Sequence, residues 1–520
     1  MIYKFLSKTA VINHIVACCL IFMCSSCNDW LAVDMEDSIM EDKLFESNDG
    51  YMSALNGIYS RLNEQYSSTL SMGTIDVMAK LYNIGSNHNS YTFYNYNFTD
   101  SSFESVSGTV WSGLYSIIAN INTLLEHCDE DGNALRPQYA NYIKGETLAL
   151  RAMLHLDLLR IYGPSYSEDT SNTICMPYQA TSSKDIQPML TAKDVAERIL
   201  DDLKTASSLL ENDLVRTEGV MNSDSDDPNE SVDFRYRQYR LNYYAVQGLL
   251  ARLYLWIGDK QNAYATANAV IQENLNRQVF PWTSKGSVQG STPDRVFSSE
   301  VLFGLYNVSR SGLYDRLFNP SGSFSSLLTF DGTSLQEGDL TSKINWFYQD
   351  VDDLRRTELW SQENVEDRNE NTGAVTQHAA ICFRKYADVA TTRSWRYMIP
   401  LLRMSELYLI AAECAPNVDE GLAYVNEIRR NRNCINLTLA EGSSETDRRA
   451  ALQTYIDDEF AREVIGEGQL YFFYKRRGLT SVLNGTGYDY ASWFGATTTI
   501  QPANYVWPLP KVESDKRVNP

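Results

Sequence analysis

Aromatic and amide side chains are densest between residues 66 and 103, where the chain shows no helical periodicity. The whole chain has 33 Tyr against 19 Phe. Exposed aromatic rings and amide side chains together suit the recognition of a polar ligand with an apolar face. This segment is therefore predicted to bind ligand. Its candidate residues are Tyr82, Asn83, Asn87, Tyr91, Tyr94 and Tyr96.

A second candidate region, residues 275–395, mixes Gly, Ser and Thr with short apolar runs. It is expected to be loop-rich, with short strands and a few helices. Its large aromatic residues include Trp282, Tyr306, Trp346 and Trp395, of which Trp282 and Trp346 are taken as ligand candidates. The two regions are expected to form one shallow binding face. The alternative for any single ring is packing against the scaffold.

Catalytic chemistry finds little support in the sequence. A pair of carboxylates could hydrolyse a glycosidic bond, but with 66 acidic residues some pair always exists. The sequence contains no GxSxG, HExxH or phosphate-binding glycine loop. Glutamates in predicted helices have arginines nearby in sequence and are expected to form ion pairs. These are Glu146, Glu406, Glu413 and Glu467. We predict a protein that is not an enzyme and holds no cofactor.

The N-terminus has the organisation of a lipoprotein signal peptide over residues 1–26. Lys4 and Lys8 precede an apolar run of residues 10–23, which is too short to span a bilayer comfortably. Two serines stand before Cys27, as a lipoprotein signal peptidase requires, so Cys27 is the predicted lipidated first residue. Residues 27–46 would form a tether. Ordinary secretion with cleavage nearby is the alternative.

The other cysteines and the charge exclude several kinds of site. Five cysteines remain beyond the N-terminus, widely spread and odd in number, so buried free thiols are favoured over a disulfide framework or a zinc site. They are Cys128, Cys175, Cys382, Cys414 and Cys434. An acidic loop at 222–234 lacks the spacing of an EF-hand, so calcium and a plain solvated loop stay open. No metal site is predicted, and a net charge of -21 argues against nucleic acid.

Helices must position these regions. Apolar spacing predicts a helix from about residue 51 to 62, another from Val110, and a third ending at Gly163-Pro164; Thr191 is the expected N-cap of a fourth. Residues 243–271 and 401–432 each read as a helix–turn–helix unit of the tetratricopeptide kind. Gly248 and Ala267 are expected at a tight helix–helix contact. We predict one domain over 47–520, with helical scaffold at about 104–273 and 400–480.

Six segments, in order, resemble the SusD/RagB family of outer-membrane nutrient-binding lipoproteins. They are residues 27–62, 145–163, 399–413, 424–432, 462–478 and 505–520. Phe473-Tyr474 departs from the family, where Asp-Leu is commoner. These are scaffold motifs, so no ligand residue can be carried over from them.

The resemblance implies a mainly α fold with four tetratricopeptide-like pairs. It also implies an outer-membrane protein that is lipid-anchored, faces the cell exterior, and delivers a glycan to a SusC-like TonB-dependent transporter. A protein-interaction scaffold, or a binder of another nutrient such as peptide, is the alternative.

Overall fold

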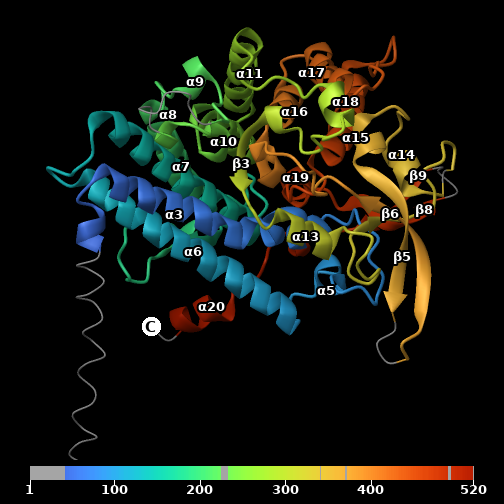
Figure 1. Ribbon diagram of the computed structural model, residues 1–520, viewed down its shortest axis with the longest axis horizontal. Helices are drawn as coiled ribbons and strands as arrows, with labels where there is room; N and C mark the ends of the chain where they lie inside the picture. The colour runs from blue at the N-terminus through green and yellow to red at the C-terminus, as the bar shows by residue number, and fades with distance from the viewer. Residues whose placement is uncertain (1–40, 224–231, 340, 369–371, 490–493, 519–520) are drawn as a thin grey trace, which may run out of the picture.

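The structure is a computed structural model that describes residues 41–223, 232–339, 341–368, 372–489 and 494–518. The predicted signal peptide, Cys27 and most of the tether lie outside these residues, as does most of the acidic loop at 222–234. Figure 1 shows a mainly helical body, which confirms the predicted fold class. No described helix combines the length and the apolar character needed to cross a membrane.

The elements keep the labels of Figure 1. The longer helices are α3 (Asn48–Tyr66), α6 (Ser101–Asp129), α7 (Pro137–Tyr162), α8 (Ala192–Leu209), α10 (Tyr243–Trp256), α11 (Lys260–Arg277), α13 (Arg310–Leu317), α16 (Met404–Cys414), α17 (Val418–Asn431), α18 (Glu445–Val464), α19 (Leu470–Arg477) and α20 (Lys511–Val518). The shorter ones are α4 (Thr74–Met78), α5 (Tyr91–Tyr94), α9 (Val215–Glu218), α12 (Lys285–Gln289), α14 (Lys343–Phe347) and α15 (Leu354–Glu358).

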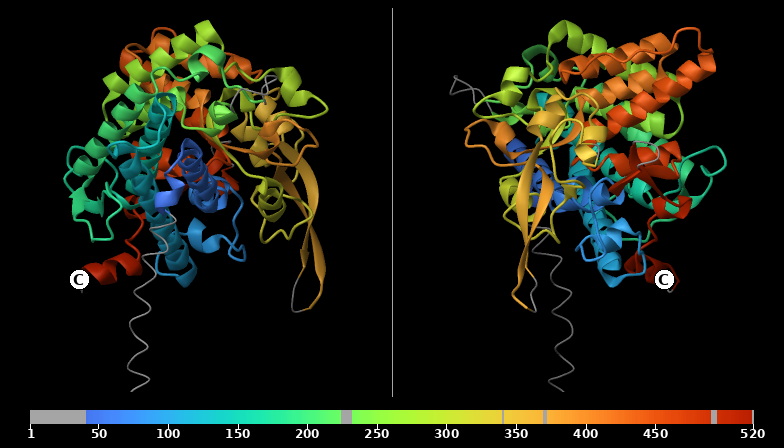
Figure 2. Two further views of the ribbon diagram at one scale, coloured as in Figure 1. Left: turned by 60° about the vertical axis from the view of Figure 1, so that its left-hand side comes forward. Right: turned by 90° about the vertical axis from the view of Figure 1, so that its right-hand side faces the viewer.

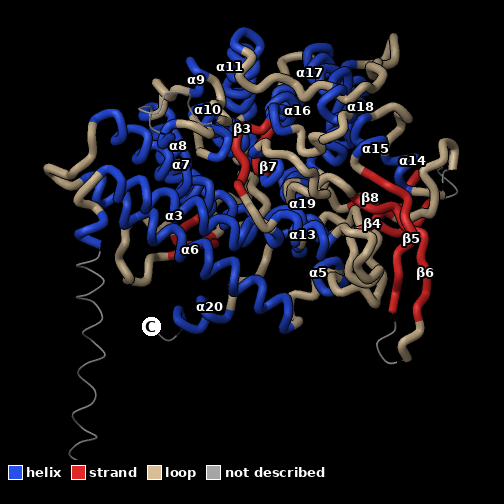
Figure 3. Tube along the Cα trace, viewed as in Figure 1, coloured by secondary structure: helices blue, strands red, loops and turns tan. Residues whose placement is uncertain are grey.

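The strands are β1 (Ile174–Pro177), β2 (Met189–Thr191), β3 (Val301–Tyr306), β4 (Thr329–Phe330), β5 (Trp360–Arg368), β6 (Val375–Phe383), β7 (Met398–Arg403), β8 (Ser481–Asp489) and β9 (Phe494–Thr499). The described strands pair antiparallel in small sheets, β1–β2, β3–β7, β4–β6–β5 and β8–β9. Figure 3 shows most of them beside the helical body, and Figure 2 shows the β5–β6 hairpin projecting from it.

Helices pack against one another in pairs to build the scaffold. The pairs are α3 with α6, α7 with α8, α10 with α11, and α16 with α17, and α11 also packs on α16. Local signals explain their ends: the Thr191 side chain accepts from the Asp194 amide at the start of α8, and Asp259 and Asn417 cap α11 and α17 in the same way. The predicted helix–turn–helix units and the Thr191 cap are confirmed.

Helix α6 begins nine residues before the predicted start at Val110, at Ser101. The Asp100 side chain accepts from the Ser102 amide, and Phe103 and Ser107 continue the buried face that Val110 belongs to. Serine-rich composition hides this first part of the helix, because polar residues carry no apolar periodicity.

The prediction for Gly248 was wrong about its neighbour. A Cβ atom at Gly248 would lie 2.6 Å from Leu402 Cδ2 on β7 and 3.4 Å from Leu302 Cδ1 on β3. The close approach is therefore between helix α10 and the β3–β7 sheet. Ala267 is fully buried on α11.

The five described cysteines are free thiols, three of them buried. The predicted glutamate ion pairs are confirmed, but their partners are far away in the sequence rather than nearby. Glu146 pairs with Arg237 at 2.6 Å, Glu406 with Arg252 at 2.7 Å, Glu413 with Arg476 at 2.7 Å, and Glu467 with Arg403 at 2.8 Å.

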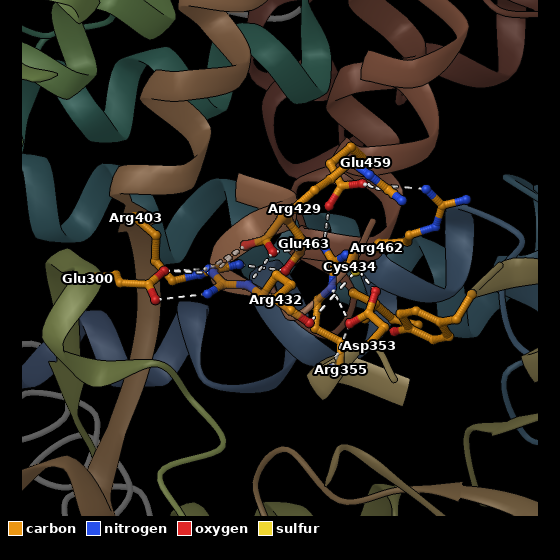
Figure 4. Close-up of polar contacts among 12 residues, drawn as sticks. Glu300, Asp353, Arg355, Arg403, Arg429, Arg432, Cys434, Glu459, Arg462 and Glu463 are labelled. Carbon is orange, nitrogen blue, oxygen red and sulfur yellow. Dashed lines mark hydrogen bonds and ion pairs between the residues drawn. The ribbon is translucent and has the colours of Figure 1, made fainter. Parts of the chain in front are cut away.

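A buried network of arginines and carboxylates joins the 275–395 region to the scaffold (Figure 4). Arg432, at the end of α17, lies 2.6 Å from Glu300 and 2.7 Å from Glu463 on α18. Arg355 on α15 contacts Glu463 at 2.8 Å, and Arg403 on β7 contacts it at 2.7 Å. Because a buried charge is costly without its partners, the network specifies how these elements meet.

This network predicts acid sensitivity. Burial opposes ionisation of Glu463, but Arg432, Arg403 and Arg355 outweigh it and hold the pKa of Glu463 well below its usual 4.5. A carboxyl with a lowered folded pKa stabilises the fold in full above its unfolded pKa, and loses that effect as the pH falls through the folded value. We expect the difference in unfolding free energy between the parent and Glu463→Gln to narrow below pH 4.5, measured by urea titration from pH 7 to 3. A difference that stays constant would contradict this.

Candidate ligand-binding cleft

A cleft of about 770 Å³ opens where helix α3 and strand β3 meet two short turns. These turns are η4 (Arg237–Tyr239), which precedes α10, and η6 (Ser394–Tyr397). Its volume is in the range of small-ligand sites. The lining is rich in tyrosine, arginine and small polar residues: Asn56, Tyr59, Ser60, Asn63, Asn222, Ser223, Val232, Arg235, Tyr236, Tyr239, Arg240, Gly304, Leu305, Tyr306, Thr392, Arg393, Ser394 and Tyr397.

The β3–β7 pair brings two segments distant in sequence to one wall of this cleft. Tyr306 at the end of β3 is paired with Met398 at the start of β7, directly after η6. The Asn63 side-chain amide donates to the Tyr306 carbonyl oxygen at 3.2 Å, which ties the end of β3 to helix α3. Figure 1 shows β3 running down to α3 in the middle of the molecule.

Buried ion pairs hold the elements of the cleft wall in position. Arg237 is fully enclosed and donates to Glu146 at 2.6 Å and to Asp213 at 2.6 Å. The Tyr59 hydroxyl donates to Glu146 at 2.9 Å and accepts from the Leu241 amide at 2.8 Å. Helices α3 and α7 and the η4 turn are thereby held in one position, so the cleft wall that carries η4 is pre-organised.

Tyr306 is the exposed aromatic ring of the cleft. It is 46% exposed, although it is supported by two neighbouring rings. Its ring centroid lies 5.4 Å from that of Tyr239, at 90°, and 5.3 Å from that of Tyr397, at 63°. Such edge contacts hold an aromatic ring in place. Tyr306 can therefore offer apolar surface to a ligand without first being ordered.

Two lining amides have unused acceptors. Asn63 Oδ1 and Asn222 Oδ1 are enclosed and accept no hydrogen bond from the described residues. Tyr236, which also lines the cleft, adopts the left-handed conformation with φ 54° and ψ 43°, which costs energy for a residue with a side chain. Its amide donates to the Met221 carbonyl oxygen at 3.0 Å, and this contact keeps the Asn222 segment against the cleft.

Four of the predicted ligand residues are core residues here, so the expectation that they are exposed was wrong. Tyr82 is fully buried, and its hydroxyl donates to Asp76 at 2.6 Å. Tyr94 and Tyr96 are under 10% exposed and enclose the Lys80 amine, 3.9 Å and 4.5 Å from their ring centres. Trp346 is 7% exposed beside Phe347. The 66–103 segment folds inward because its tyrosines satisfy buried polar groups.

The other predicted residues keep some surface but do not line the cleft. Asn87 and Tyr91 are exposed, and Tyr91 is 37% exposed at the start of α5. Asn83 is half-buried and its amide donates to the Thr329 carbonyl oxygen at 2.8 Å. Trp282 is half-buried against Tyr408, 5.0 Å between ring centres. The structure therefore does not bring the eight candidates to one face.

Sequence reasoning named Tyr306 but missed the rest of the cleft. Tyr59 lies within the helix predicted at residues 51–62, where it fits the apolar spacing and carries no separate signal of a ligand site. The run of alternating aromatic and basic residues at 234–240, Phe-Arg-Tyr-Arg-Gln-Tyr-Arg, was the available signal. It places Tyr236, Tyr239 and Arg240 in the lining while Arg237 points into the core.

Two tyrosine hydroxyl groups of the cleft are uncharged. Burial raises the pKa of Tyr59 and of Tyr239, so both remain neutral hydroxyl groups at physiological pH. The described residues contain no cluster of three or more side chains suited to a metal ion. What the cleft offers is aromatic surface, amide groups and guanidinium groups, which together suit a polar ligand with an apolar face.

Comparisons with known proteins agree with this architecture. Residues 251–517 match the family model described as the SusD family, and residues 29–221 match a model described as starch-binding and associating with the outer membrane. No curated protein matches the chain.

Solved structures with the same fold are similar over nearly the whole chain. A SusD superfamily protein from Bacteroides thetaiotaomicron shares 22% identity with a TM-score of 0.62, covering 91% of this chain and 98% of its own. A SusD-like carbohydrate binding protein from Bacteroides vulgatus shares 15% identity with a TM-score of 0.64, covering 91% and 97%. A SusD superfamily protein from Bacteroides fragilis shares 19% identity with a TM-score of 0.59, covering 92% and 100%.

Proposed function

The chain belongs to the SusD/RagB family, and on that premise we propose that it is a cell-surface lipoprotein that binds a glycan in the cleft around Tyr306. The observation that carries the proposal is the supported, half-exposed Tyr306 ring beside enclosed amide acceptors. A sugar ring can stack its C–H face on Tyr306 while its hydroxyl groups donate to Asn63 and Asn222.

The family premise also supports a route for the ligand. A SusC-like TonB-dependent transporter would receive the glycan from this protein at the outer membrane, with the protein facing the cell exterior. The SusD-like relative from Bacteroides vulgatus is itself described as carbohydrate binding. A rigid cleft with no catalytic constellation among the lining residues fits capture and delivery of an intact ligand.

Binding to a glycan array, followed by calorimetry on the best ligand, tests the proposal. We expect at least one glycan to bind, and the Tyr306→Ala protein to bind it more weakly. If the parent binds no glycan but binds peptides, the alternative of another nutrient replaces the proposal. If a soluble protein binds only the transporter, the protein-scaffold alternative replaces it.

Membrane attachment is proposed to depend on Cys27. Lipid on this cysteine supplies the anchor, so Cys27→Ala should move the protein from the membrane fraction to the soluble fraction. Mass spectrometry of the mature N-terminus and fractionation of cells measure the two effects. Cys24→Ala is the matched control and should leave the protein on the membrane. An unmodified N-terminus far from residue 27 would contradict the proposal.

A further inference from the structure

We infer that the ligand of the Tyr306 cleft is an acidic glycan, bearing carboxylate or sulfate groups, and that Arg393 is its anion contact. The inference rests on the proposed function and specifies its ligand class. The described lining of the cleft is opposite in charge to the chain as a whole. The chain has 66 acidic against 45 basic residues, yet the described lining contains three arginines, Arg235, Arg240 and Arg393, and no Asp or Glu.

Two of the three arginines are held by the protein. Arg240 donates to the Asn56 side chain, lies 3.9 Å from a Glu146 oxygen, and stacks 4.8 Å from the Tyr59 ring centre. The Arg235 Nε donates to the Ser223 carbonyl oxygen at 2.6 Å. These two arginines are therefore fixed in place by protein contacts.

Arg393 differs from both. It is exposed, and within the described chain its guanidinium makes no hydrogen bond and no ion pair with another side chain or carbonyl. Its planar set of donors matches the two oxygens of a carboxylate or sulfate group. An acidic group that enters the cleft can therefore pair with Arg393 without displacing a described protein partner.

Arg393 also lies at the junction with a second cleft. This neighbouring cleft, about 890 Å³, shares Asn222, Arg393 and Ser394 with the first. It adds Arg216 and Arg277, which both contact the single carboxylate of Glu273, at 3.0 Å and 3.3 Å. Glu273 and Glu218 balance these two arginines, so Arg393 is the positive side chain at the junction of the two clefts that has no carboxylate partner among the described residues.

The two amide acceptors favour a sugar over a simple anion as the ligand. Asn63 Oδ1 and Asn222 Oδ1 lack donors, which sugar hydroxyl groups supply and a sulfate ion at neutral pH does not. The Arg393 guanidinium pairs more strongly with a negatively charged acceptor than with the hydroxyl groups of a neutral sugar. A sugar with acidic substituents supplies both the hydroxyl donors and the anionic acceptor. Residues 224–231, which include four acids, follow Ser223 in the sequence. The difference in affinity between matched acidic and neutral ligands therefore reports the combined effect of these acids and the arginines.

The test compares matched ligands by calorimetry with the whole mature protein. One pair is an oligogalacturonide and its carboxyl-reduced form; the other is a chondroitin sulfate oligosaccharide and its desulfated form. We expect the acidic member of at least one pair to bind at least about tenfold more tightly, with an affinity that falls as salt rises. A preference for the oligogalacturonide over its reduced form indicates a carboxylate contact, and a preference for the sulfated over the desulfated chondroitin oligosaccharide indicates a sulfate contact.

Arg393→Gln and Arg396→Gln form a matched set, because both remove one positive charge from the same turn and Arg396 lies outside both linings. Arg393→Gln should remove most of the preference for the acidic ligand, and Arg396→Gln should keep it. Equal binding of acidic and neutral members, or equal effects of the two variants, overturns the inference. The proposed function stands in that case if Tyr306→Ala still weakens glycan binding, and it fails if neither the array nor these ligands bind.

Discussion

Glu463→Gln should lower the free energy of unfolding by about 3–5 kcal/mol at pH 7, the cost of leaving buried charges without their partner. Glu463 is 1% exposed at its side chain and accepts from three arginines, Arg355, Arg403 and Arg432. Glutamine keeps the shape but removes the negative charge, and its amide would point donors at guanidinium groups. Figure 4 shows how closely these side chains converge.

Glu445→Gln on the same helix is the control for this change. Glu445 is exposed and contacts Arg449 at 3.1 Å on the surface, where ion pairs contribute about 0–1 kcal/mol. Urea unfolding of both variants measures the two losses. If Glu463→Gln were no less stable than Glu445→Gln, the network would not hold the 275–395 region to the scaffold.

Tyr306→Ala should weaken binding of the best glycan by at least tenfold while the melting temperature stays near that of the parent. Aromatic stacking on nucleic-acid bases, the nearest measured scale, contributes about 1–3 kcal/mol per ring. Because Tyr306 is 46% exposed at the end of a strand, its removal opens little of the core. Calorimetry and thermal melting separate a lost contact from a lost fold.

Val308→Ala is the matched control for this site. Val308 is 66% exposed, two residues from Tyr306, and outside the cleft lining. It should bind glycan as the parent does. Equal affinity for the parent and the Tyr306→Ala protein would place the glycan elsewhere, with exposed Tyr91 and Asn87 as the next residues to change.

The scaffold could be predicted from the sequence because its signals are local. Helix ends are set by nearby residues, as at Thr191, Asp259 and Gly163-Pro164, and the buried faces repeat with helical spacing. The start of α6 escaped prediction because its first turns are rich in serine. A resemblance over six ordered segments then gave the family, which the comparisons confirm.

The site could not be predicted in the same way, because exposure is decided by tertiary packing. Tyr82 and Tyr91 belong to the same tyrosine- and asparagine-rich segment, yet Tyr82 is buried on Asp76 and Tyr91 is exposed. Likewise, the partner of Glu146 is Arg237, 91 residues away, and this pair shapes the cleft wall. No spacing rule connects residues so distant in the chain.

The most direct measurement of the central claim is a crystal structure of the protein with its best-binding glycan. The account predicts a sugar ring stacked on Tyr306, with hydroxyl groups within hydrogen-bond distance of the Asn63 and Asn222 side chains. A glycan bound at the Tyr91 surface or on the β5–β6 hairpin, with the Tyr306 cleft empty in the same crystal, would contradict it.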